Sequence, residues 1–291
     1  MLTTHQALQR MKADIQLRGF SPNTLRMYLA YTEAFLNYCD RPVEQLDELD
    51  VRQFLWHLVS EGKVKAGTVN FYNASIRFFF AVTLNRTMNY LQMPRMKRSK
   101  NLPVILSRDE INALVANCDN LKHRALILTA YGSGLRVSEL VNLKVTDIDS
   151  RSMRILVRSG KGDKDRYTIL SENALQSLRD YWRRYRPNNP DGYIFPGCKN
   201  VGYLTQSAVI GAVKEAAIKA NITKVVSTHT LRHCFATHLL EDGYSLLQIK
   251  EMLGHTCIQS TTLYLRLSDS TSGVTSPADN LPDISLVQCR G

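Results

Sequence analysis

The sequence predicts a mainly α-helical protein with a small antiparallel β-sheet (α+β), divided into two domains. Apolar residues recur at the spacing of an amphipathic helix through most of the chain. Two β-rich runs flank a glycine-containing turn in MRILVRSGKGDKDRYTIL, residues 153–170, which is typical of a β-hairpin. A stretch of prolines and basic residues near residue 95 interrupts the helical pattern. A length of 291 residues suits two domains of ordinary size.

The first domain, residues 1–94, is predicted to be entirely helical. In SPNTLRMYLAYTEAFLNYC, Ser21 suits the N-cap and Pro22 the first helical position. In GTVNFYNASIRFFFAVTL, Val69, Ile76 and Phe80 fall on one side of a helix. The four helices are expected near residues 4–18, 21–39, 50–60 and 67–84.

Residues 95–106, RMKRSKNLPVIL, are predicted to be a basic linker between the domains. Their prolines and weak periodicity argue against a helix or strand. The alternative is a charge run that only meets solvent. The net charge of +11 favours a polyanionic partner, most often nucleic acid, so the linker is expected to contact DNA phosphates. The expected contact residues are Arg95, Lys97, Arg98 and Lys100.

The second domain is predicted to span residues 107–267, with the hairpin inside it. Ser107 and Glu110 form a capping-box pattern at its first helix. A polar, breaker-rich tail follows at residues 268–291. Its apolar DISLV segment is expected to serve assembly, with a disordered end as the alternative. After the first helix, further helices are expected near residues 121–134, 172–185, 205–219, 230–241, 246–252 and 259–266.

Composition excludes several other classes of protein. No apolar run reaches the length of a membrane span, and the first residues lack the apolar core of a secretion signal. The six cysteines form no C-x-x-C pair, which argues against a zinc ribbon and against a disulfide framework. A cytoplasmic protein with reduced thiols is expected. The chain lacks the G-x-x-x-x-G-K-[ST], G-x-G-x-x-G and G-x-S-x-G motifs of nucleotide, dinucleotide and α/β-hydrolase sites.

His229 and His233 are four residues apart, as two metal ligands on one helix face would be. A metalloprotease would need glutamate where this chain has Thr230. Arg232 would also lie beside the cation and repel it. We therefore expect no metal at these histidines.

Four basic residues combine better as an anion site. Arg136 follows two glycines and should start a helix, where anions bind well, and its planar fork suits two phosphate oxygens. His229 and Arg232 are three apart and share a helix edge. Lys161 sits at the hairpin tip, within reach of a groove. Taken one at a time, each of these residues also has a purely structural explanation. Arg136 could form an ion pair with Glu139, and Lys161 could be a turn lysine exposed to solvent.

Tyr264 is either an ordinary helix tyrosine or a residue placed to react. It follows His255 by nine residues, on a short segment flanked by threonines, from which it could swing toward a bound phosphate. Simple packing is the alternative role. Tyr244, the nearest competitor, lies between a capping glycine and a capping-box serine, which makes it a corner residue with a structural task.

Taken together and in their order along the chain, these motifs resemble those of the tyrosine recombinase (phage integrase) family. The resemblance covers the chain from about residue 5 to 267. The resemblance implies a two-domain clamp, with a helical, SAM-like core-binding domain before the catalytic domain. The matching motifs are YGSGLRVSEL with Arg136, GKGDKDR with Lys161, HTLRHCFATHLL with His229 and Arg232, MLGH with His255, and STTLYLRL with Tyr264.

The resemblance also implies a mechanism. Tyr264 would attack a DNA phosphate and form a 3′-phosphotyrosyl link, and Lys161 would protonate the leaving 5′-oxygen. Arg136 and Arg232 would bind the phosphate oxygens, His255 would add a hydrogen bond, and His229 would accept the tyrosine proton or polarise the phosphate. No metal or small-molecule cofactor is implied. The implied partners are double-stranded DNA recombination sites, two of which are held by a homotetramer.

Integration or excision of a mobile element is the biological role that we expect, because the tail differs from the short ending of Xer proteins. Xer-type resolution of chromosome or plasmid dimers is the alternative. A type IB topoisomerase would use the same chemistry on one strand. A catalytically idle DNA-binding regulator would not need the complete residue set.

Overall fold

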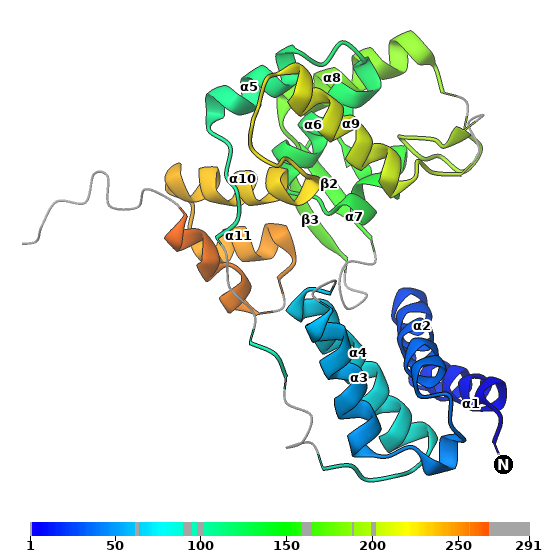
Figure 1. Cartoon of the computed structure of the whole chain (residues 1–291). Coiled ribbons are helices and arrows are strands. Elements are labelled where there is room, and N and C mark those ends of the chain that lie inside the picture. Colours follow the sequence, from blue (N-terminus) through cyan, green and yellow to red (C-terminus); the bar gives the residue numbers. More distant parts are fainter. Residues whose placement is uncertain are drawn as a thin grey trace, which may run out of the picture. The chain divides into compact units, whose positions relative to one another are not determined.

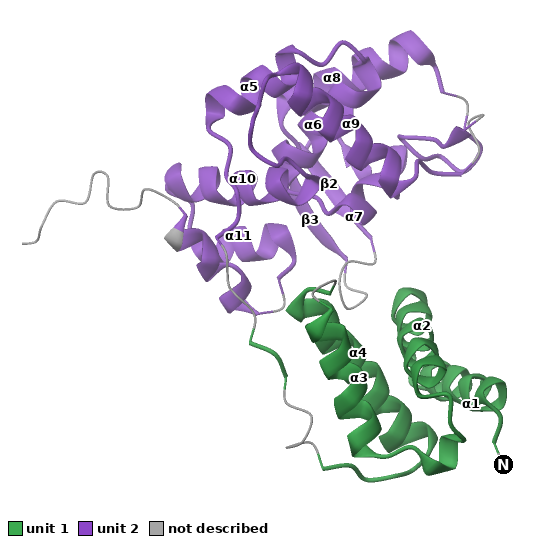
Figure 2. Ribbon diagram, viewed as in Figure 1, with its two compact units in different colours: residues 1–101 green, residues 102–291 purple. Residues whose placement is uncertain are grey.

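The computed structural model describes residues 2–61, 64–89, 95–97, 102–158, 165–187, 189–198, 202–255 and 257–267. The chain divides into two compact units, Met1–Asn101 and Leu102–Gly291 (Figure 2). Lys161, Arg98, Lys100 and the tail at 268–291 lie outside the described residues. In the part of the chain that is described, no helix combines the length and the apolar character that crossing a bilayer requires.

Unit 1 is helical (Figure 1). As expected, α2 begins with Pro22 at its first position, and the Ser21 hydroxyl accepts a hydrogen bond from the Thr24 N–H at 3.2 Å. A short 3-10 turn, η1, connects α2 to α3, and a π-helical turn, η2, continues α4. The elements are α1 (Thr4–Leu17), α2 (Pro22–Cys39), η1 (Val43–Gln45), α3 (Glu48–Ser60), α4 (Ala66–Phe78) and η2 (Phe79–Thr83).

The core of unit 1 is aromatic. Phe35 of α2 packs against Phe54 of α3 with ring centroids 5.5 Å apart, and against Phe80 of η2 at 6.2 Å. Val69 and Ile76 are buried in the same core, which confirms the predicted apolar side of this helix. Burial of these side chains supplies the main favourable term in folding the unit.

Unit 2 is built around α6, which is buried on several sides and packs against α8, α9 and α10 (Figure 1). A helix without a polar face belongs inside a domain. Its helices are α5 (Arg108–Ala116), α6 (Leu121–Ser133), α7 (Val137–Val141), α8 (Glu172–Tyr185), α9 (Gln206–Lys219), α10 (Thr228–Glu241) and α11 (Leu246–Leu253).

Among the described residues of unit 2, three strands form one antiparallel sheet in the order β1-β2-β3. They are β1 (Ile148–Asp149), β2 (Arg154–Val157) and β3 (Arg166–Ile169). The register pairs Val157 with Arg166 and Arg154 with Ile169. The fold is therefore mainly helical with a small sheet, as predicted. The two-residue strand β1 was not predicted from the sequence.

The predicted α-helix at 259–266 is wrong. The chain forms two 3-10 turns there, η6 (Ile258–Ser260) and η7 (Thr262–Arg266). The Thr262 hydroxyl donates a hydrogen bond to the Gln259 carbonyl at 3.1 Å. Serine and threonine side chains compete in this way for backbone groups that an α-helix would use, and Gln259-Ser260-Thr261-Thr262 is rich in them.

Candidate active site

The carboxylate of Glu139, on α7, gathers two arginine side chains. Its two oxygens accept hydrogen bonds from Nη1 and Nη2 of Arg166 at 2.9 and 2.8 Å, the two-point pairing that suits a guanidinium and a carboxylate. Glu139 also accepts from the backbone N–H of Arg136 at 2.8 Å and from its Nη1 at 2.7 Å. Arg136 is the N-cap residue of α7, so these bonds also close the first turn of that helix.

The surroundings of Glu139 keep it ionised. Its side chain is only 6% exposed, and burial alone raises the pKa of a carboxyl group. The hydrogen bonds and positive charges of Arg166 and Arg136 outweigh burial and lower the pKa of Glu139 to about 2. The site therefore contains a permanent negative charge that offsets part of the arginine charge.

Arg232, on α10, is held by the ends of two other helices. Its Nη1 donates to the Gly134 carbonyl at 2.6 Å, and its Nη2 donates to the Leu253 carbonyl at 2.5 Å. Gly134 ends α6 in the left-handed region, with φ +60°, and a Cβ there would lie 2.4 Å from the Phe235 ring. Only glycine fits this position, and it presents the carbonyl that Arg232 binds.

Arg166, at the start of β3, is held in a similar way. Its Nε donates to the Met252 carbonyl at 2.8 Å. Gly254 follows with φ +63°, and a Cβ there would lie 2.8 Å from Arg166 Cδ. Sequence reasoning missed Arg166, although it is the last residue of the GKGDKDR motif. From the sequence, Glu139 is predicted only as a possible partner of Arg136.

Three guanidinium groups and one carboxylate give the site a positive balance. Burial lowers the pKa of Arg232 to about 10, helped by the nearby Arg136 charge, so Arg232 stays cationic at neutral pH. The side chain of Arg136 is 23% exposed, compared with 5% for Arg232 and 10% for Arg166. Arg136 is therefore the most accessible of the three to an incoming anion, and the other two strengthen the positive field behind it.

Tyr264 lies beside this cluster, in η7, with its ring buried. Its hydroxyl is 3.2 Å from Nδ1 of His233, and the His255 ring lies nearly parallel to the tyrosine ring, with centroids 6.4 Å apart. Burial raises the pKa of Tyr264, while the charges of Arg232 and Arg136 oppose that rise. The sequence predicts a segment from which Tyr264 could swing toward a phosphate, and in this structure its ring is buried beside His233 and His255.

The histidines differ in their surroundings. His255 Nδ1 is 2.9 Å from the Thr261 hydroxyl oxygen. Burial, together with the charges of Arg232 and Arg136, lowers the pKa of His255 to about 4, so its ring is neutral at pH 7. His229 lies in the first turn of α10 with an exposed side chain. Its side chain has no hydrogen bond or ion pair to any residue that the structure describes.

The structure thus brings Arg136, Arg232, His255 and Tyr264 into one site. Lys161 is outside the described residues, but Val157 and Arg166, the paired ends of β2 and β3, border the segment that carries it. Over the described part of the chain, no group of three or more histidine, cysteine, aspartate or glutamate side chains could hold a metal ion.

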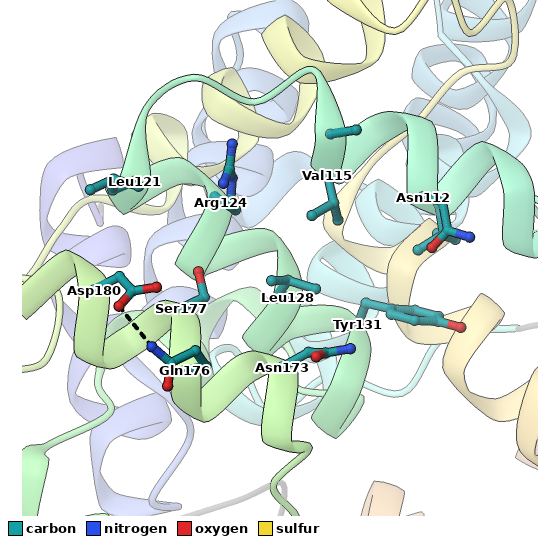
Figure 3. A pocket seen from close by; sticks show the side chains of 12 residues that line it. Asn112, Val115, Leu121, Arg124, Leu128, Tyr131, Asn173, Gln176, Ser177 and Asp180 are labelled. Atoms are coloured by element: carbon teal, nitrogen blue, oxygen red, sulfur yellow. Dashed lines mark hydrogen bonds between the residues drawn. The ribbon is translucent and has the colours of Figure 1, made fainter.

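A separate pocket lies between α5, α6 and α8 (Figure 3). Polar groups at its wall are bonded within the protein: Gln176 donates to Asp180 at 2.8 Å, and Arg124 donates to the Cys118 carbonyl. The Tyr131 hydroxyl meets Nδ1 of the buried His238 at 2.8 Å. The lining includes none of the site residues described above.

The linker backbone at Met96 is held against α4. The Met96 N–H donates to Oδ1 of Asn70 at 2.8 Å, and the Asn70 amide donates to the Met96 carbonyl at 2.9 Å. The Met96 side chain packs against the unit 1 core. Arg95 and Lys97, on either side of Met96, are exposed.

Glu139→Gln should destabilise unit 2 and make its stability less sensitive to acid. Glu139 contributes stability above the ordinary carboxyl pKa of 4.5, and that contribution is lost as the pH falls toward about 2. Removing one partner of a buried ion pair typically costs about 3–5 kcal/mol. Denaturant unfolding of both proteins, followed from pH 7 to pH 2, measures the effect.

Glu251→Gln is the matched control, because it removes an exposed carboxylate from α11. It should leave the free energy of unfolding within about 0.5 kcal/mol of the parent protein. If Glu139→Gln behaved like this control at pH 7, the carboxylate would not be holding the arginines together.

Comparison with known proteins places both units in one family. Residues 105–271 match the Phage integrase family, and residues 7–90 match the Phage integrase N-terminal SAM-like domain. A Sinorhizobium fredii protein named "Putative integrase/recombinase y4qK" is 40% identical over 276 residues, covering 94% of this chain and 89% of the relative. Tyrosine recombinase XerA of Pyrococcus furiosus is 33% identical, with 90% of each chain covered.

Solved structures agree with this assignment. The crystal structure of XerA recombinase is similar with a TM-score of 0.55 and 27% identity, covering 92% of this chain and 96% of that one. A lambda integrase dimer bound to a core site shares the fold, with a TM-score of 0.71, 19% identity, and 97% and 99% coverage. The resemblance inferred from the motifs is confirmed. The chain belongs to the phage integrase family and is a site-specific DNA recombinase of the tyrosine type.

Proposed function

We propose that Tyr264 is the nucleophile of this recombinase and that Arg136 and Arg232 bind the scissile phosphate. The observation that carries the proposal is the cluster of guanidinium groups around Glu139, with the Tyr264 ring buried beside it. Donors fixed before the reaction begins stabilise charge that develops on a phosphate more effectively than donors that must reorganise.

The proposed reaction retains the energy of the broken phosphodiester bond in the covalent intermediate. Tyr264 Oη attacks phosphorus, the new O–P bond forms, and the bond to the 5′-oxygen breaks, leaving the 3′ phosphate on the tyrosine. A 5′-hydroxyl from another strand then reverses these steps and reseals the DNA. The arginines supply the positive charge and the phosphotyrosine retains the bond energy, so the proposal invokes no metal, ATP or other cofactor.

Arg232 and Arg136 are suited to different parts of this task. Arg232 has two of its N–H groups committed to backbone carbonyls, which fixes the guanidinium plane and leaves other donors for a phosphate oxygen. Arg136 is more exposed and can meet the phosphate first. His255 is neutral and can add a hydrogen bond to the same phosphate.

Lys161 is proposed as the acid that protonates the leaving 5′-oxygen. The segment that carries it begins after Val157 and ends before Arg166, itself a member of the arginine cluster. This connection supports a lysine near the phosphate. A cation is also well suited to deliver a proton to an oxygen that gains negative charge.

We further propose that the biological role is integration or excision of a mobile element. The 40% identical relative carries the name integrase/recombinase, and solved relatives include an integrase of the Tn1549 transposon in complex with DNA, which shares the fold. Xer-type dimer resolution is the second candidate, supported by the XerA relative. A type IB topoisomerase is a weaker candidate, because the Xer-like motifs and the relatives favour recombination. An idle DNA-binding regulator is also weaker, because the full set of expected residues is present.

The proposed substrates are double-stranded DNA recombination sites, two of them held by a homotetramer in the cytoplasm. Solved relatives in complex with recombination sites support the DNA partner. The proposed domain boundaries are 1–94, 95–106 for the linker, 107–267 and 268–291 for the tail. The family matches over residues 7–90 and 105–271 support the two domains.

Tyr264→Phe should bind DNA like the parent protein and form no covalent complex. Phenylalanine keeps the buried ring but lacks the attacking oxygen. The parent protein is incubated, without metal or ATP, with nicked duplexes that carry a randomised core, because a nick beside the cut traps the adduct. Sequencing the captured DNA identifies the site, and peptide mapping locates the attachment.

The parent protein should carry DNA on Tyr264 through a 3′ phosphate. Tyr244→Phe is the matched control and should retain full adduct formation, since Tyr244 is an exposed residue between α10 and α11. DNA attached to any other residue, or cleavage by Tyr264→Phe, would exclude Tyr264 as the nucleophile.

Replacing Arg95, Lys97, Arg98 and Lys100 by alanine should weaken DNA binding and reduce its dependence on salt. Each lost phosphate contact lowers the salt slope by about one unit. Asn70→Ala should give a smaller loss of the same kind, because it frees the Met96 backbone that presents Arg95 and Lys97. Affinities for the captured site at several salt concentrations measure both effects.

The control removes two exposed arginines from the end of α8, Arg183 and Arg184. It changes the net charge of the protein without touching the linker. Equal slopes for the linker variant and the parent protein would show that the linker does not contact phosphate.

A further inference from the structure

His233 is the residue that meets the oxygen proposed as nucleophile. Its Nδ1 lies 3.2 Å from the Tyr264 hydroxyl, and the two rings are 5.7 Å apart at an angle of 53°. His229 is exposed and makes no such contact with Tyr264. The two histidines are one turn apart on the same face of α10, and of the two it is His233 that lies within hydrogen-bond distance of the Tyr264 hydroxyl.

We propose that His233 is a further catalytic residue, which takes the phenol proton when Tyr264 attacks the phosphate. The inference rests on the proposed function, since it requires Tyr264 to be the nucleophile. It leaves the exposed His229 to bind a phosphate oxygen, the other role open to that residue.

The contact fits a proton acceptor. A tyrosine hydroxyl within hydrogen-bond distance of a neutral imidazole nitrogen donates to it, so the ring proton of His233 belongs on Nε2. A base is needed to remove the phenol proton, because the pKa of an ordinary tyrosine is near 10 and burial raises the pKa of Tyr264 further.

The surroundings of His233 keep its ring neutral, so that it can accept a proton. Burial lowers its pKa, and the nearby His229 and Arg232 lower it further, so the ring is neutral at pH 7. The other groups that face it are Tyr264 of η7 and His255, which follows α11 and is itself neutral. A bound phosphate would bring negative charge to the site and favour the imidazolium at the moment when the proton moves.

The step balances in both directions. During cleavage, the Tyr264 oxygen gains the bond to phosphorus, its proton passes to His233 Nδ1, and the 5′-oxygen leaves with a proton from the acid assigned to Lys161. During resealing, the 5′-hydroxyl attacks and returns a proton to that acid. Tyr264 then leaves and recovers its proton from His233. No oxidant, reductant or further reactant takes part.

The test replaces the tyrosine by a phenol that needs no base. Full-length protein with difluorotyrosine at position 264, whose hydroxyl ionises much closer to neutral pH, is compared with protein that has ordinary Tyr264. Each is combined with His233→Ala, His233→Gln or His229→Ala. Single-turnover cleavage of the nicked duplex captured by the parent protein is followed at pH 7.

With ordinary Tyr264, both His233 variants should cleave about a hundredfold to ten-thousandfold more slowly than the parent protein, which is the usual contribution of a positioned base. Difluorotyrosine should recover most of that loss. It should recover little of the loss caused by His229→Ala. Loss of a purely structural contact would not depend on the acidity of the phenol.

His233→Gln keeps a side chain of similar size that can hydrogen-bond to the tyrosine but cannot take its proton, so it tests the proposal even if His233→Ala unfolds. Cleavage by His233→Gln at the parent rate, or a loss that difluorotyrosine leaves unchanged, would overturn the role of His233. Attachment of DNA to a residue other than Tyr264 in the parent protein would instead overturn the proposed function. Peptide mapping separates these two outcomes.

Discussion

The carboxylate of Glu139 is the constraint on which the rest of the site depends. Three guanidinium groups cannot be gathered in a largely buried space without a compensating charge, because like charges repel strongly where water is scarce. Glu139 binds Arg166 at two points and Arg136 through both backbone and side chain, and it lies 3.7 Å from Arg232. The first turn of α7, the start of β3 and the middle of α10 therefore meet at one group.

Helix ends supply the second restraint. The carbonyls that accept hydrogen bonds from Arg232 and Arg166 belong to Gly134, Leu253 and Met252, at the C-terminal ends of α6 and α11. Those ends carry partial negative charge and unpaired carbonyl oxygens, so cationic side chains stabilise them while being oriented by them. Left-handed glycines end both helices, and no larger residue could let the arginine side chains and the Phe235 ring approach so closely.

Much of this fold follows from local sequence. The cap at Ser21 and the capping box at Ser107 each act within a few residues, so they can be predicted without tertiary structure. The roles of Glu139 and Arg166 cannot be predicted from local sequence. Glu139 lies 27 residues from Arg166 along the chain and further still from Arg232, and only the meeting of α7, β3 and α10 turns these three ordinary charged residues into one network.

The region of the proposed nucleophile shows the same limit. The motif around Tyr264 identifies the residue, but neither the 3-10 turns nor the burial of its ring could be predicted from the sequence. Both depend on how η7 packs against α10, where His233 meets the tyrosine hydroxyl. His233 was read from sequence only as a possible metal ligand, because its contact with Tyr264 spans 31 residues.

The central claim is that the arginines act by neutralising charge on the scissile phosphate, and a neutral phosphate tests it most directly. A duplex whose scissile phosphate is replaced by a methylphosphonate has one negative oxygen fewer, so an arginine that faces that oxygen is no longer needed. Single-turnover cleavage by Arg136→Ala is compared on the two duplexes, each measured relative to the parent protein. The account predicts a loss on the phosphate of at least about a hundredfold, as for removal of other fixed oxyanion donors, and a much smaller loss on the methylphosphonate. Equal losses on both duplexes would contradict the account, because they would make Arg136 a structural residue of α7 and not a ligand of the phosphate.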